Sequence, residues 1–179
     1  MTWEFRVLDY IAGFHSEILN NIMIYISALN DNGYVWIAVA IILLCSKKYR
    51  IIGFGCALAL IIMQISGNMI IKPIVDRPRP YELRNIVLLI DKPSGSSFPS
   101  GHTYSSFACA TVIYLFNKRA GLSAFILAVL IAFSRMYLYV HFPTDVIGAM
   151  IFGVIDGIIC YFIVMKLNNF KNMILNTSC

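Results

Sequence analysis

The chain alternates between long apolar stretches and short polar connections, a pattern typical of helices that cross a membrane. Residues 51–71 contain 21 positions without a charge, and about 20 apolar residues are enough to cross the hydrocarbon core as a helix. Further apolar stretches predict the remaining helices, at 16–29, 33–46, 101–117, 120–140 and 146–165. The pattern therefore predicts an all-α fold, a multi-span transmembrane helical bundle with about five to six membrane helices.

The first third of the chain departs from this pattern in two places. Over residues 1–14, apolar and charged positions recur at helical spacing, which predicts an amphipathic helix lying in the membrane interface. Residues 16–29 are short and contain a glutamate and two asparagines, so they predict a partial span packed on the bundle. The sequence Asn-Asp-Asn-Gly at 30–33 is a turn signal that separates this segment from the next helix.

The longest polar connection, residues 72–100, is dense in proline, arginine, glycine and serine. The span before it is expected to end at Lys72, because Pro73 disfavours a helical conformation in the preceding residue. Within the connection, residues 81–90 predict a short helix on the membrane surface. Residues 1–179 are treated as a single membrane-embedded domain, because 179 residues are enough for one.

Composition agrees with the membrane interpretation. Hydrophobic residues make up 59% of the chain, charged residues only 13%, and the mean hydropathy is +0.76, which is unusual for a soluble protein. The first four residues do not predict a cleavable signal peptide. The net charge of +5 comes without a polybasic run or a stacking-aromatic pattern, so nucleic acid is not an expected partner. The five cysteines are scattered and predict neither disulfides nor a metal site.

Basic residues bear on orientation, because cytoplasmic loops are enriched in lysine and arginine. If the spans alternate, one face carries Lys47, Lys48, Arg50, Lys118, Arg119, Lys166 and Lys171. The other face carries nearly as many: Lys72, Arg77, Arg79, Arg84, Lys92 and Arg135. The second group clusters at the candidate chemistry described next, where a ligand accounts for its charge. We therefore expect the 72–100 loop and the active face to be extracytoplasmic.

An arginine, a histidine and an aspartate lie close together in an otherwise apolar region, residues 134–145, where charged groups are costly to bury. His141 and Asp145 are four residues apart, and Pro143 between them favours a new helix start. An aspartate so placed can hold one ring nitrogen of the histidine and leave the other free to react. Arg135, at the edge of a span, is expected to pair with an anion. A histidine nucleophile, an orienting carboxylate and an anion-binding arginine together suggest phosphoryl chemistry.

Two further polar patches reach the same face if the spans alternate. One joins Lys72 to Arg79-Pro80, and the other is Pro-Ser-Gly-His at 99–102. Each patch alone has an ordinary structural explanation: a lysine that extends to the interface, a turn before a helix, or a structural salt bridge. Their convergence on one mouth of the bundle is what indicates a site.

The order and spacing of the three patches resemble the signature of the type 2 phosphatidic acid phosphatase superfamily, the lipid phosphate phosphatases. The matching positions are Lys72, Arg79, Pro80, Pro99, Ser100, Gly101, His102, Ser134, Arg135, His141 and Asp145. The motifs and their spans cover residues 51–165, and residues 1–32 have no such support.

The resemblance implies a role for each site residue. His141 would attack phosphorus and form a phosphohistidine, oriented by Asp145, and His102 would protonate the leaving oxygen. The phosphoryl group would be bound by Lys72, Arg79, Ser100, Gly101 and Arg135. Ser100 and Gly101 would act through the start of a helix. These cations would replace a metal, so neither a metal nor another cofactor is expected. Arg77 is an additional cation that could contact a second phosphate or only a headgroup.

Three functions are compatible with these residues. The first is hydrolysis of a lipid phosphate or diphosphate, preferably a polyprenyl diphosphate such as undecaprenyl diphosphate, with phosphatidylglycerol phosphate or phosphatidate as alternatives. The second is transfer of the phosphoryl group to another lipid through the same phosphohistidine. The third is lipid binding or transport without catalysis, which does not need a nucleophile and is disfavoured by His141, His102 and Asp145.

One acidic residue, Asp156, lies outside the motifs. It follows Asp145 by 11 residues, so it would lie on nearly the same helix face and about 16 Å deeper. A structural role is expected, with Gln64 or Asn68 of a neighbouring span as the hydrogen-bond partner. Small residues at 149, 153 and 157 predict close packing of the same helix.

Overall fold

The computed structural model describes the backbone of residues 2–177 and the side chains up to residue 169. All regular elements in this part are helical, which confirms the all-α prediction. In chain order they are α1 (Thr2–Ala12), α2 (Glu17–Ala28), η1 (Asp31–Gly33), α3 (Tyr34–Cys45), α4 (Arg50–Met63), η2 (Gln64–Ile71), α5 (Lys72–Val75), α6 (Pro80–Leu83), α7 (Gly101–Phe116), α8 (Lys118–Tyr137) and α9 (Pro143–Thr177).

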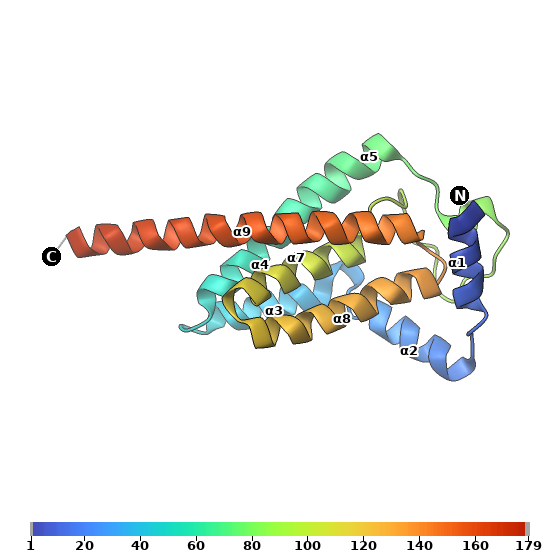
Figure 1. Cartoon of the computed structure of the whole chain (residues 1–179), viewed down its shortest axis with the longest axis horizontal. Helices are drawn as coiled ribbons and strands as arrows, with labels where there is room; N and C mark the ends of the chain where they lie inside the picture. Colours follow the sequence, from blue (N-terminus) through green and yellow to red (C-terminus); the bar gives the residue numbers. More distant parts are fainter. Residues whose placement is uncertain (1, 178–179) are drawn as a thin grey trace.

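The central element is α7, which packs against α4, α8 and α9 (Figure 1). Every residue from Thr103 to Ile113 is buried, so this helix presents no face to solvent or lipid along most of its length. A helix that is buried all round must be surrounded by other elements. The packing around α7 therefore places its first residues, including His102, at the centre of one end of the bundle.

Close packing of α9 on α7 depends on glycines, as the small-residue pattern predicted. A methyl group added at Gly153 would lie 2.8 Å from the Phe107 Cβ and the Tyr104 carbonyl oxygen. At Gly157 it would lie 2.6 Å from the Thr111 Cβ. Neither contact leaves room for a side chain, so the backbones of the two helices approach as small-residue stripes in membrane helices allow.

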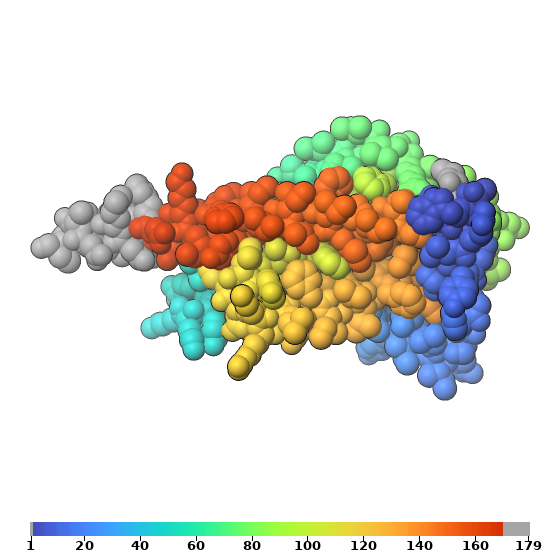
Figure 2. Space-filling model, viewed as in Figure 1, coloured from blue at the N-terminus to red at the C-terminus, as the bar shows by residue number. Residues whose placement is uncertain are grey.

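Several helices have the length and composition of membrane spans. Among the described residues, three qualify, at Arg50–Leu83, Lys118–Tyr137 and Pro143–Asn169, and a fourth results if the bent pair Glu17–Ala28 and Asp31–Cys45 is one span. Large apolar side chains remain exposed on the outer surfaces of these helices, among them Phe54, Ile61 and Phe162. Such surfaces suit contact with lipid tails. Helix α1 lies across one end of the bundle (Figure 2).

Two boundary predictions around residue 72 are wrong. The helix does not end at Lys72: α4 passes into the π-helical turns of η2 and continues through α5 to Val75. Pro73 is accommodated because it lies in the first turn of α5, where a missing amide hydrogen costs least. The surface helix expected over 81–90 is confined to α6, and residues 84–100 contain no helix.

Two boundaries near the C-terminal half also differ from the prediction. α8 begins at Lys118 rather than at 120, because the Asn117 side chain caps it by accepting from the Ala120 amide at 3.1 Å. α9 begins at Pro143, the start that the proline indicated, rather than at 146 where the apolar stretch begins, so Asp145 lies in its first turn, and it continues past the predicted end at 165. The residues between the two helices therefore form a short connection that carries His141.

The partner expected for Asp156 is also corrected. Its carboxylate accepts a hydrogen bond from the Tyr104 hydroxyl of α7, and neither Gln64 nor Asn68 is the partner. Asn68 instead donates to Gln64 at 2.6 Å. The Tyr104 oxygen also lies 2.9 Å from the Ser66 hydroxyl, so a small polar network links η2, α7 and α9 inside the bundle.

Asp156→Asn is expected to be tolerated better than Asp156→Leu. Asparagine keeps an acceptor for the Tyr104 hydroxyl, whereas leucine removes it and leaves a polar group less well satisfied, at about 1–3 kcal/mol. Thermal unfolding of both variants in detergent measures the difference. Equal stability of the two variants would contradict a role for this hydrogen bond.

Candidate active site

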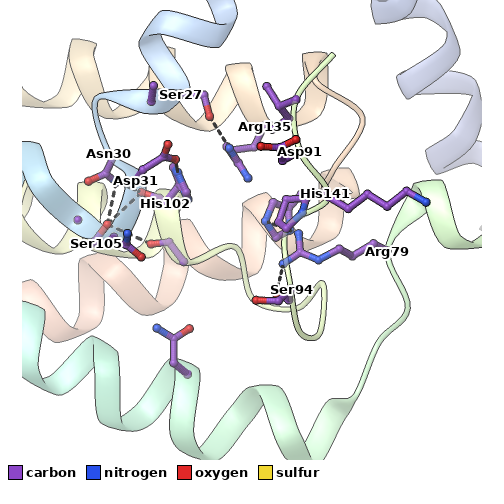
Figure 3. Close-up of a pocket in the computed structure, with 18 of the residues that line it drawn as sticks. Ser27, Asn30, Asp31, Arg79, Asp91, Ser94, His102, Ser105, Arg135 and His141 are labelled. Atoms are coloured by element: carbon purple, nitrogen blue, oxygen red, sulfur yellow. Dashed lines mark hydrogen bonds and ion pairs between the residues drawn. The ribbon is translucent and has the colours of Figure 1, made fainter. Parts of the chain in front are cut away.

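A polar cavity of about 1160 Å³ opens at one end of the bundle. Its lining includes six of the predicted site residues: Lys72, Arg79, Gly101, His102, Arg135 and His141 (Figure 3). They come from α5, the 76–79 connection, the start of α7, the end of α8 and the α8–α9 connection. The three sequence patches thus meet at one site, as the alternation of spans predicted. The other three, Arg77, Ser100 and Asp145, lie behind this lining.

His141 is almost fully buried, and its two ring nitrogens have different surroundings. Nε2 lies 3.3 Å from Nη1 of Arg79, and Nδ1 lies 3.7 Å from Oδ2 of Asp145. Because a guanidinium only donates hydrogen bonds, Nε2 must be the acceptor and carry the lone pair. Burial, together with the nearby charges of Arg79 and Arg135, lowers the pKa of His141 to about 3. The ring is therefore neutral near pH 7, and Nε2 is the atom that can attack.

Asp145 is held by three donors. Its Oδ1 accepts from Nη1 of Arg77 at 2.5 Å, while Oδ2 accepts from the Ser97 hydroxyl at 2.5 Å and the Phe142 amide at 2.7 Å. The last contact closes the first turn of α9, as acidic residues at the third helical position commonly do. The carboxylate is fully buried. Its orientation is therefore fixed independently of His141.

Arg77 does not line the cavity. Besides Asp145, its guanidinium contacts both carboxylate oxygens of Glu4 in α1, at 3.0 and 2.8 Å, and the Thr144 hydroxyl at 2.6 Å. It also lies over the Phe142 ring, 4.2 Å from the centroid. This arrangement ties α1 to the start of α9 and occupies the group that the sequence associated with a second phosphate or a headgroup.

The cation Arg79 is fixed by backbone carbonyl groups. It is 3% exposed, and its guanidinium donates to the carbonyl oxygens of Gly95, Ser94 and Val140 at 2.8, 3.1 and 3.1 Å. Gly95 has a φ of 73°, a conformation that side chains disfavour, and this turn aims its carbonyl at the arginine. These carbonyls hold Arg79 rigid without neutralising its charge.

Arg135 and Lys72 complete the cationic wall. Arg135 is 3% exposed, donates to the Ser27 hydroxyl, and keeps a buried Nε without a hydrogen-bond partner among the described residues. Lys72 reaches the start of α7, because a methyl group added at Gly101 would lie 3.9 Å from its Nζ. Ser100 is the N-cap residue of α7. Unpaired donors and a helix N-terminus around one space are suited to a bound anion.

His102 has a partner that the sequence analysis missed. Its Nε2 lies 2.9 Å from Oδ1 of Asp31 in η1 (Figure 3). Other residues missed from the sequence support the site from behind: Glu4, Ser27, Asn30 and Ser97. They come from the segments with no motif or from the irregular loop. In the sequence, the segment that contains Asp31 was marked only by the turn signal at 30–33, and a turn signal does not indicate a functional role.

No group of three or more histidine, cysteine, aspartate or glutamate side chains within the described part of the chain is arranged to hold a metal ion. The charged side chains that line the cavity are the cations Lys72, Arg79, Lys92 and Arg135 and the acids Asp31 and Asp91.

Comparisons with known proteins agree with this geometry. The profile of the PAP2 superfamily matches residues 48–169. An undecaprenyl-diphosphatase from Sulfolobus acidocaldarius is 34% identical over 137 residues, which is 75% of this chain and 66% of that protein. Undecaprenyl-diphosphatase BcrC from Bacillus subtilis is 26% identical over 164 residues, 90% of this chain and 83% of that protein.

A solved structure extends the similarity to three dimensions. The crystal structure of Aquifex aeolicus LpxE superposes with a TM-score of 0.76 at 30% sequence identity, covering 87% of this chain and 93% of that one. The family match covers more than half of the chain and includes every residue of the three patches. This all-helical membrane protein therefore belongs to the PAP2 superfamily.

Proposed function

We propose that the chain, as a lipid phosphate phosphatase of this family, hydrolyses a polyprenyl diphosphate such as undecaprenyl diphosphate through a phosphohistidine on His141. The observation that carries the mechanism is the pair of contacts on that ring. Nε2 accepts from Arg79, a group that binds phosphate well, while Nδ1 is directed at the immobilised carboxylate of Asp145. A nucleophile and an anion-binding group thus share one wall, and the orienting carboxylate lies behind it.

The reaction begins when a phosphoryl group displaces the contact between Arg79 and His141. The lone pair on Nε2 forms a bond to phosphorus as the bond from phosphorus to the leaving oxygen breaks. His102 gives that oxygen a proton. Asp145 stabilises the positive charge that develops on the His141 ring. Lys72, Arg79 and Arg135, with the start of α7 at Ser100 and Gly101, bind the phosphoryl oxygens.

The second half of the reaction restores the enzyme. Water attacks the phosphohistidine, His102 takes a proton from that water, and the bond between Nε2 and phosphorus breaks to release phosphate. The proton given away in the first half is thereby recovered. Arg77 supports both halves by holding Asp145, and no direct contact with phosphate is assigned to it.

A lipid substrate is favoured over a soluble one by the surroundings of the cavity. An apolar groove of about 450 Å³ runs between α3 and α4 and shares Asn32, Gly33, Met63 and Gln64 with the polar cavity. A headgroup in the cavity can therefore be continuous with a hydrocarbon chain on the outer surface. The two relatives named as undecaprenyl-diphosphatases support the polyprenyl diphosphate as the first substrate to test.

Phosphate release from a panel of lipids in detergent tests the substrate. We expect the highest kcat/KM with undecaprenyl diphosphate, ahead of phosphatidylglycerol phosphate and phosphatidate, and unchanged turnover in excess EDTA. Preference for either phospholipid would overturn the polyprenyl assignment. Loss of turnover in EDTA, restored by Mg²⁺, would overturn the metal-free mechanism. Phosphate appearing on an added acceptor lipid instead of in solution would identify a phosphotransferase.

The extracytoplasmic placement of the site is a further proposal with its own test. It rests on the clustering of basic residues at the cavity, which leaves the loops at 47–50 and 118–119 as the cytoplasmic ones. Single cysteines at Lys92 and Lys118, in a cysteine-free background, are expected to differ on intact cells. An impermeant thiol reagent should label position 92 and not position 118. The reverse pattern would invert the topology.

A further inference from the structure

The break between α2 and α3 is fixed onto the active site. The two segments meet at an angle of 43°, and the backbone turns through Asn32 and Gly33, whose φ values are 52° and 80°. Asn30 is 1% exposed and donates through Nδ2 to the His102 carbonyl oxygen and the Ser105 hydroxyl, both at 2.9 Å. One buried side chain thus holds the break against the first turn of α7.

This clamp presents Asp31 to the imidazole ring of His102. Oδ1 of Asp31 lies 2.9 Å from Nε2, in a pair that faces the cavity, with the aspartate side chain 55% exposed and the histidine 18% (Figure 3). An ionised carboxylate only accepts, so Nε2 must carry a hydrogen. The ring nitrogen that remains to exchange a proton with a substrate is therefore Nδ1.

The charges that face His102 explain why a carboxylate is needed there. Burial of the ring lowers the pKa of His102, and the nearby charges of Arg135 from α8 and Lys72 from α5 lower it further. Asp31 from η1 is the acidic group that raises it. The same cations are required to bind phosphate, so a protonated His102 beside them needs a compensating negative charge.

We propose that Asp31 is a positioning residue for the general acid, fixing the His102 tautomer and supporting its protonated form at the moment the leaving oxygen departs. This inference rests on the proposed phosphatase function. In the protonated ring, Nε2–H stays bonded to Asp31 while Nδ1–H passes to the leaving oxygen. The neutral ring that results has its lone pair on Nδ1, which then takes the proton from the attacking water.

The test compares Asp31→Asn on two leaving groups. With phosphatidate, whose leaving group is an alcohol that must be protonated, kcat is expected to fall about 10- to 100-fold, less than the roughly 10²–10⁴-fold that a general acid supplies. With p-nitrophenyl phosphate, whose leaving group needs no proton, the loss should be about twofold or less. The high-pH limb of kcat/KM for the lipid should also move to lower pH, because the protonated ring loses its partner. Asp31→Glu, which keeps the carboxylate, should recover part of both effects.

Two controls separate this role from a structural one. Asp91→Asn removes the same charge from the same cavity and should change both substrates by the same factor. In a His102→Ala background, Asp31→Asn should cause no further loss on the lipid, because the group it positions is gone. Equal losses of Asp31→Asn on both substrates, or full additivity with His102→Ala, would overturn the inference. An inactive wild-type protein would instead overturn the proposed function.

Discussion

His141→Ala is expected to form no phosphoenzyme with any substrate, whereas His102→Ala is expected to form one with a substrate whose leaving group needs no proton. The two histidines enter the cavity from different elements and have different partners. Nε2 of His141 carries a lone pair beside Arg79, as a nucleophile requires, while Nε2 of His102 is occupied by Asp31. Of these two Nε2 atoms, only that of His141 can make a bond to phosphorus, and His102 is left to exchange a proton through Nδ1.

Rapid quench with labelled lipid phosphate and labelled p-nitrophenyl phosphate distinguishes the two variants. His102→Ala should lose about 10²–10⁴-fold on the lipid, the range for a general acid, and much less on the nitrophenyl ester. It should also accumulate phosphoenzyme from the ester, because the water attack lacks its base. Asp145→Asn should fall between the two histidine variants. Phosphoenzyme that persists in His141→Ala and disappears in His102→Ala would reverse the assigned roles.

Arg77→Met is expected to cause a large loss of stability together with a loss of activity. The guanidinium lies between the carboxylates of Glu4 and Asp145, whose side chains are 5% and 0% exposed. Without it, two buried carboxylates lose the cation that lies between them, and breaking a buried ion pair in this way costs about 3–5 kcal/mol. Thermal unfolding in detergent measures the stability, and kcat on the lipid substrate reports the loss of support for Asp145.

A matched control is available in Arg84, which also joins α1 to the rest of the molecule. It pairs with Asp9 at 2.8 Å, but both side chains are largely exposed, at 42% and 52%. Arg84→Met should therefore change stability little, since exposed ion pairs contribute little. Adding Glu4→Gln to Arg77→Met should restore part of the lost stability, because it removes one of the two buried carboxylate charges. Equal effects of the two arginine variants would show that burial does not decide the outcome.

The residues that line the cavity were easier to predict from the sequence than the residues that hold them in place. The cavity residues follow from motif spacing and from the alternation of spans, because each motif lies at a helix end on the same side. Asp31, Glu4 and Ser97 could not be found that way. Each is a single polar residue that reaches its partner across 71, 73 or 48 positions of sequence. Only the packing of α1, of the α2–α3 break and of the 84–100 loop onto the bundle end reveals these pairs.

Helix ends were predictable only where local chemistry decides them. Pro143 starts α9 as expected, since proline is suited to a first helical turn. Pro73 misled because the same preference let a further helical segment, α5, begin there directly after η2. The Asp156 partner was misplaced for a different reason. The rotation of η2 about its axis is not recorded in the pattern of apolar positions.

The chain of contacts from Glu4 through Arg77 to Asp145 has a consequence for biosynthesis. These residues are far apart along the chain, and Asp145 lies in the first turn of the last helix. Arg77 is synthesised 68 residues before Asp145. During synthesis, α1 and the 76–79 connection therefore cannot complete these contacts until more than 60 further residues have been added. Such non-local closure is slow compared with local helix formation. The nascent chain therefore stays inactive until nearly all of its helices have been inserted, and active-site assembly is one of the last steps of its folding.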